Sequence, residues 1–147
     1  MTLLKDPPTN ILVPIDFSEQ SEKAAKAASA LAKTTGATVH LLHAYEIPVE
    51  SVGLAYTVSN QYVDQFVAET TTRLQDLAAK TFEGVTMGPP IVKSGDPREV
   101  IADTAKALGA EIVVMGTHGR RGLSRAIIGS VAEGVVRTAP CSVLVVR

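Results

Sequence analysis

The chain has 147 residues, the usual size of a single domain, and its 46% hydrophobic and 20% charged residues exclude a disordered composition. Fourteen Lys and Arg against 15 Asp and Glu give a formal net charge of −1, which argues against a general nucleic-acid binder. The single cysteine, Cys141, excludes an internal disulfide framework and a cysteine-rich zinc site.

The same features indicate where the protein works. No apolar run reaches the ~18 residues of a membrane span. The first eight residues carry charge and prolines where a signal peptide would need an apolar stretch. We therefore expect one domain over residues 1–147, located in the cytoplasm, with neither a membrane nor a nucleic acid as partner.

The first two predicted elements are a strand and a helix. Residues Ile11 to Ile15 form an apolar run without helical period, typical of a buried parallel strand. Pro14 should lie near the end of that strand, where a missing N–H is tolerated. Ser18 is expected to cap a helix from Glu19 to Thr35, which Gly36 ends.

The middle of the chain is less regular. The pattern predicts a strand from Thr38 to Ala44, a long loop from Tyr45 to Asn60, and a helix from Gln61 to Lys80. The inward stripe of that helix is expected at Val63, Phe66, Val67, Leu74, Leu77 and Ala78. A third strand, Thr86 to Lys93, contains Gly88-Pro89-Pro90 and is therefore expected at a sheet edge.

The last third of the chain continues the alternation of strand and helix. Asp96 and Pro97 predict a helix start, and that helix should end at Leu108-Gly109. A fourth strand from Ile112 to Met115, a helix from Ser130 to Thr138 and a strand from Val143 to Val146 follow. This order predicts a doubly wound α/β sheet with right-handed crossovers.

The segment after the fourth strand is the strongest candidate for a binding site. From Gly116 to Ser130 it holds four glycines, three arginines and no acid. Glycine backbones and a helix start can present N–H groups to an anion, and open parallel sheets bind ligands beyond the carboxyl ends of their strands. The spacing is neither a Walker A motif nor a dinucleotide fingerprint. Two interpretations remain open: a phosphate site, or a surface loop with solvated arginines, Arg120, Arg121 and Arg125.

The motifs of the whole chain resemble one family. The spacing Gly116-x2-Gly119-x9-Gly129-Ser130 is similar to the ATP-binding signature of the universal stress protein family, G-x2-G-x9-G followed by Ser or Thr. The opening Ile-Leu-Val-Pro-Ile-Asp-Phe-Ser, the Gly-Asp-Pro before the third helix, and the closing Ala-Pro-Cys-Ser-Val-Leu-Val-Val resemble that family too.

The resemblance implies a fold and a ligand. The fold is a Rossmann-like α/β sandwich with a five-stranded parallel sheet of order 3-2-1-4-5 and helices on both faces. The ligand is ATP, with or without Mg²⁺, in a cytoplasmic stress-response or signalling role. The resemblance also implies a homodimer joined through the strand Val143 to Val146; it names no client protein.

The family pattern assigns the site residue by residue. It implies that Gly119, Gly129 and Ser130 hold the phosphates with the backbone donors of Val131 and Ala132. It also implies that the adenosine pocket is lined by Pro14, Asp16, Ala44 through its backbone, and Met115. In the implied strand order, Asp16 and Gly116 face each other across the crevice. Asp16 is left open as a contact to ribose, to adenine or to Mg²⁺.

The remaining histidines have simpler interpretations. His118 lies inside the glycine segment, where a phosphate contact and a partly exposed loop histidine are both open. His40 and His43 should point to opposite faces of their strand, which argues against a shared metal, and His43 is expected to be a hydrogen-bonded interior residue. Cys141 is expected to be a buried structural thiol.

Three functions compete at this stage. The first is an ATP-binding stress or signalling module with slow or no turnover. The second is an enzyme, a slow ATPase or autophosphorylating protein, with Asp16 or His118 positioning water. The third is a dimeric interaction protein that binds no nucleotide.

Overall fold

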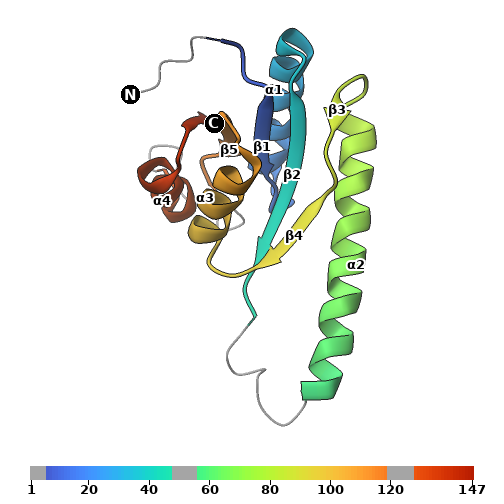
Figure 1. The fold of residues 1–147 in the computed structure, drawn as a ribbon. Coiled ribbons are helices and arrows are strands. Elements are labelled where there is room, and N and C mark those ends of the chain that lie inside the picture. The colour runs from blue at the N-terminus through green and yellow to red at the C-terminus, as the bar shows by residue number, and fades with distance from the viewer. Residues whose placement is uncertain (1–5, 48–55, 119–127) are drawn as a thin grey trace.

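A computed structural model describes residues 6–47, 56–118 and 128–147. Its strands are β1 (Asn10–Pro14), β2 (Thr38–Tyr45), β3 (Thr86–Met87), β4 (Ile91–Ser94), β5 (Ile112–Gly116) and β6 (Ser142–Val146). Its helices are α1 (Glu19–Thr35), α2 (Tyr56–Thr81), α3 (Pro97–Leu108) and α4 (Ser130–Thr138). Strands and helices alternate along the chain, as the sequence predicts, apart from the pair β3 and β4 (Figure 1).

The strands form one parallel sheet of order β3-β2-β1-β5-β6, and β4 also pairs with β2. The predicted α/β class and strand order are therefore confirmed, but the described sheet has six strands rather than five. Gly88-Pro89-Pro90 splits the expected third strand because proline cannot donate to a ladder. The Gly88 N–H instead donates to the Val39 carbonyl at 2.9 Å.

Two helices cover each face of the sheet. Helices α1 and α2 pack on one face, where alanines of α1 and Leu74 of α2 meet Ile11 and Val13 of β1. Helices α3 and α4 pack on the other face, where Ile101 and Ala132 meet the alternate side chains of the same strands. The strands at the centre are buried on both faces, which is why they appear in the sequence as continuous apolar runs (Figure 1).

Helix α1 has the predicted ends. The Ser18 hydroxyl accepts the Ser21 N–H at 3.2 Å, which satisfies one of the unpaired donors of the first turn. Gly36 ends the helix with a φ of 75°, a conformation that favours glycine. The four-alanine stripe between these ends lets the helix lie close to the sheet.

Helix α2 differs from the prediction. It begins at Tyr56, so the expected loop from Tyr45 to Asn60 is wrong for its last five residues; it is also wrong for Tyr45, which ends β2, while 48–55 lie outside the described part. Leu74 is fully buried, as predicted, but Phe66 is 38% exposed. A helix of 26 residues is about 39 Å long, longer than the strands it covers, and its first turns extend beyond the sheet (Figure 1).

Over the described ranges, no helix combines the length and the apolar character needed to cross a bilayer.

Candidate functional site

A pocket of about 510 Å³ lies where the carboxyl ends of β1, β2 and β5 meet the first turns of α3 and α4. Open parallel sheets bind ligands at such a point, where the strand order reverses. Gly119 is outside the described residues. All other predicted site residues line this one pocket: Pro14, Asp16, Ala44, Met115, Gly116, His118, Gly129, Ser130, Val131 and Ala132.

The first turn of α4 supplies donors to the pocket. The N-cap residue Gly129 has no side chain to bond them, whereas Ser18 caps α1 and Asp96 caps α3. The first hydrogen bond of this helix runs from the Glu133 N–H to the Gly129 carbonyl at 3.0 Å. The N–H groups of Ser130, Val131 and Ala132 therefore lack an acceptor within their own helix and carry the positive end of its dipole.

Two signature glycines are required by the backbone around them. A Cβ at Gly116 would lie 2.9 Å from the Gln20 carbonyl carbon, and a Cβ at Gly129 would lie 2.8 Å from the Thr117 carbonyl oxygen. The Gly129 N–H donates to that same oxygen at 2.7 Å. The Gly129 amide is thus bonded to Thr117, so the donors directed at a ligand are those of the residues that follow Gly129.

The turn between β1 and α1 fixes Asp16. Its Oδ1 accepts the Ser18 N–H at 2.9 Å, an Asx-type contact that orients the carboxylate. Between them Phe17 has a φ of 63°, which bulky residues rarely adopt. The Arg73 guanidinium of α2 lies 3.7 Å from the centre of the Phe17 ring, and this cation–π contact fastens the turn to α2.

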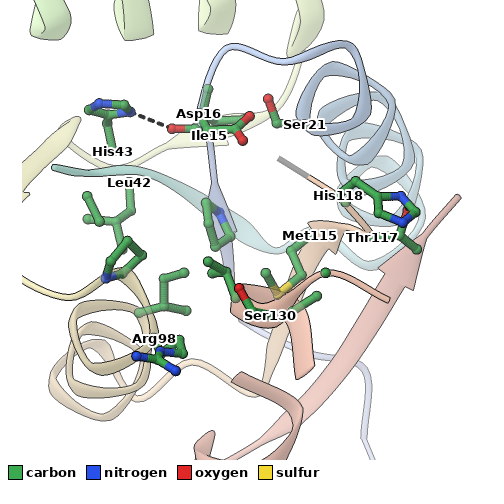
Figure 2. A pocket seen from close by; sticks show the side chains of 18 of the residues that line it. Ile15, Asp16, Ser21, Leu42, His43, Arg98, Met115, Thr117, His118 and Ser130 are labelled. Atoms are coloured by element: carbon green, nitrogen blue, oxygen red, sulfur yellow. Dashed lines mark hydrogen bonds between the residues drawn. The ribbon is translucent and has the colours of Figure 1, made fainter. Parts of the chain in front are cut away.

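Both backbone polar groups of Ile15 form hydrogen bonds with residues of β2. Its N–H donates to the Leu42 carbonyl at 2.7 Å, and its carbonyl accepts a hydrogen bond from Nδ1 of His43 at 2.7 Å (Figure 2). The hydrogen bond predicted for His43 is confirmed, but the residue is half-buried rather than interior, and it lines the pocket. Its ring packs 5.2 Å from Phe17 and 6.2 Å from Phe66, measured between ring centres.

His118 has one polar partner among the described residues. Its Nδ1 lies 2.9 Å from the Thr117 hydroxyl, and its buried Nε2 has no hydrogen-bond partner within residues 6–47, 56–118 and 128–147. The two side chains lie together in Figure 2, apart from the Ser130 hydroxyl. The side chain of His118 is 9% exposed, so the interpretation as a partly exposed loop histidine is wrong, and a phosphate contact stays a prediction.

Asp96 and Arg98 form a rim that the sequence interpretation missed. Arg98 donates to the Asp96 carboxylate through Nε at 3.1 Å and Nη2 at 2.7 Å, and both residues line the pocket. The hydrogen bond from Arg98 lowers the pKa of Asp96 to about 2, and Asp96 in turn raises the pKa of Arg98. The sequence signal that could have identified Asp96 as a pocket residue is its position directly after β4, at the carboxyl end of a parallel strand.

The other histidines of the described residues have separate partners. His40 bonds Asn10 at 3.0 Å through Nε2, while His43 bonds Ile15, so the two histidines have separate partners. In the ranges that the structure covers, no three His, Cys, Asp or Glu side chains gather as metal ligands. Cys141 is half-buried rather than buried as expected. Burial nevertheless raises the pKa of its thiol, which agrees with a structural rather than a reactive cysteine.

Comparison with known proteins gives consistent matches. The model of the Universal stress protein family matches residues 8–147. Universal stress protein MJ0531 of Methanocaldococcus jannaschii is 34% identical over 93% of this chain and 81% of its own length. The solved structure of hypothetical protein MJ0577 superposes with a TM-score of 0.81 at 29% identity, covering 94% of both chains.

Two more distant solved members were determined as nucleotide complexes. A universal stress protein in complex with cAMP has a TM-score of 0.70 at 20% identity and covers 97% of this chain and 98% of its own. The Archaeoglobus fulgidus protein in complex with dAMP has a TM-score of 0.62 at 22% identity and covers 99% and 100%. At these identities the likeness is one of fold.

Proposed function

We propose that this chain, which belongs to the universal stress protein family, binds ATP in the pocket between β1 and β5 and acts as a stress-response or signalling module. The observation that carries the proposal is the first turn of α4, whose donors have no side-chain cap and open on a pocket of about 510 Å³. That volume lies in the usual range for small-molecule sites.

The phosphates would lie at α4. The amides of Ser130, Val131 and Ala132 provide donors for anionic oxygens, with the helix dipole adding to the attraction. The Ser130 side chain adds a hydroxyl at the same turn. Asp16 lines the pocket and, as a hard oxygen ligand, would suit Mg²⁺ bridged to the phosphates; a bare carboxylate would repel them.

The adenosine part would lie between β1, β2 and α3. Its walls are apolar and come from Pro14, Leu42, Ile101, Met115 and Val131. Ala44 supplies polar groups through its backbone at the end of β2. The cAMP and dAMP carried by the two distant members share the adenine base, which supports an adenine nucleotide here.

The proposed module works in the cytoplasm as a homodimer. Its dimer contact is the open edge of β6, where Leu144 is 41% exposed. Nucleotide binding at α4 would then lie one element away from the contact between the subunits.

The test removes one amide and leaves the helix in place. Ser130→Pro deletes the first helical N–H, and proline suits this position because Gly129 has φ −64° and ψ 158°. Ser130→Ala is the control that keeps the amide. In calorimetry with Mg-ATP, we expect Ser130→Pro to weaken binding by about tenfold or more relative to Ser130→Ala, as for a lost charge-assisted hydrogen bond.

Two results would contradict the proposal. Absence of binding heat for the parent at millimolar Mg-ATP, with no adenine nucleotide found by mass spectrometry after gentle purification, would favour the interaction protein without nucleotide. Parent affinity in Ser130→Pro would refute the placement of the phosphates. Phosphate release measured on the same samples reports turnover, and rates on the order of 1 s⁻¹ would identify an enzyme.

A further inference from the structure

The β1–β2 ladder ends in an unusual way. In a parallel ladder, a residue donates its N–H to one partner and accepts at its carbonyl from the residue two positions further along the other strand. Because the Ile15 N–H donates to the Leu42 carbonyl, the next bond would run from the Ala44 N–H to the Ile15 carbonyl. No such bond is present between these two described residues; the His43 ring donates to the Ile15 carbonyl instead, at 2.7 Å.

The replaced bond leaves the Ala44 backbone directed at the pocket. Backbone groups of a strand alternate in direction, so those of Ala44 point to the same side as those of Leu42, toward β1. Tyr45 points the other way, and its carbonyl accepts the Gly95 N–H at 2.8 Å. Beyond Ile15 the chain turns away into α1, so the Ala44 side of β2 faces the pocket that Ala44 lines.

We propose that His43 is a positioning residue for base recognition: its ring takes the Ile15 carbonyl and thereby keeps the N–H and carbonyl of Ala44 for the edge of an adenine. The inference rests on the proposed function. Adenine offers an acceptor at N1 beside a donor at its 6-amino group, the complement of one backbone donor and one acceptor. Hypoxanthine presents the reverse pair and would be rejected.

The surroundings of His43 suit this role. The rings of Phe17 and Phe66 both pack against the His43 ring and restrict its rotation. Its Nδ1 is directed at the Ile15 carbonyl (Figure 2). Nδ1 carries a proton in one neutral tautomer and in the imidazolium, so the contact survives protonation. Asparagine can place an amide N–H where Nδ1 stands, whereas leucine fills the space without a donor. These two variants are therefore a matched pair.

The first experiment needs no nucleotide. Amide hydrogen exchange by NMR on the ligand-free protein should find the Ala44 N–H unprotected in the parent and in His43→Asn. In His43→Leu the Ala44 N–H should close onto the Ile15 carbonyl and exchange at least tenfold more slowly. An Ala44 amide already protected in the parent, or unchanged in His43→Leu, would overturn the inference.

The second experiment measures base selectivity. We expect the parent and His43→Asn to prefer ATP over inosine triphosphate by about tenfold or more, since a mismatched edge leaves polar groups unpaired. In His43→Leu this ratio should fall to about threefold or less, with unchanged affinity for inorganic triphosphate, because only the base contact is lost. An unchanged ratio would refute the role of His43 and leave the proposed function intact. A parent that binds no ATP would refute the proposed function, while the exchange result still decides the role of His43.

Discussion

The Thr117 carbonyl leaves no room for a side chain at Gly129. A Cβ there would come within 2.8 Å of the Thr117 carbonyl oxygen, a backbone atom that cannot move aside alone. We therefore expect Gly129→Ala to lower the free energy of unfolding by about 1–3 kcal/mol, as for other overpacked sites. Urea unfolding followed by circular dichroism measures the change.

The neighbouring residue provides the control for this prediction. Ser130 is exposed, and Ser130→Ala should change stability by no more than about 0.5 kcal/mol. A Gly129→Ala protein as stable as this control would mean that the Thr117 contact does not constrain the loop.

The sequence predicted which residues lie together at the candidate site, but it did not predict the hydrogen bonds between them. The spacing of Gly116 and Gly129, together with the strand order, placed both residues at one edge of the sheet, because the carboxyl ends of parallel strands meet there. The sequence does not show which backbone N–H groups face a ligand. That depends on the hydrogen bond by which the Thr117 carbonyl takes up the Gly129 N–H. The contact between His43 and Ile15 likewise joins two strands whose register the sequence does not specify.

At the scale of elements, the negative charge of Asp96 stabilises the start of α3, and this charge is lost when the carboxylate is protonated at low pH. The pKa of Asp96 is lowered to about 2 from its ordinary 3.8, chiefly by its hydrogen bond from Arg98. Because the folded pKa lies below the unfolded one, the stabilisation is complete above pH 4 and is lost as the pH falls toward 2.

Thermal unfolding across this pH range tests the cap. At pH 6 we expect Asp96→Ala to unfold a few degrees below the parent, because the cap of α3 is lost. The gap should narrow as the pH falls from 4 to 2. Asp103→Ala, an exposed acid in the same helix, is the control and should keep the melting temperature of the parent at pH 6. A gap for Asp96→Ala that stays constant down to pH 2 would contradict the assignment.

The helices and strands could be predicted where their packing against neighbours requires particular residue types. Helix α1 shows its cap, its alanine stripe and its terminal glycine in the sequence because each meets a fixed neighbour. The first turns of α2 extend beyond the sheet (Figure 1). Residues 60–69 contain no buried side chain, so no stripe of buried residues marks this part of the helix. Gly88-Pro89-Pro90 showed in the sequence that the expected third strand is interrupted. The sequence did not show that β3 and β4 both pair with β2, because that pairing depends on the position of β2.

At the scale of the whole molecule, the proposed dimer depends on the exposed edge of β6. Leu144 lies on this edge and is 41% exposed. Sedimentation should show a dimer for the parent and a monomer for Leu144→Lys, because a charge on an edge strand opposes pairing. Thr86→Lys, an exposed position on β3 at the opposite edge, should leave the dimer unchanged. A dimer that survives Leu144→Lys would place the contact elsewhere.

The two borders of the sheet are chemically unequal. One is interrupted by adjacent prolines between β3 and β4, and proline has no N–H with which to recruit another strand. The other, β6, is uninterrupted. Growth of a sheet from molecule to molecule into a fibre requires an adhesive border on both sides of each unit. A unit with one such border would join a single neighbour, so association through the proposed β6 contact would end at a pair.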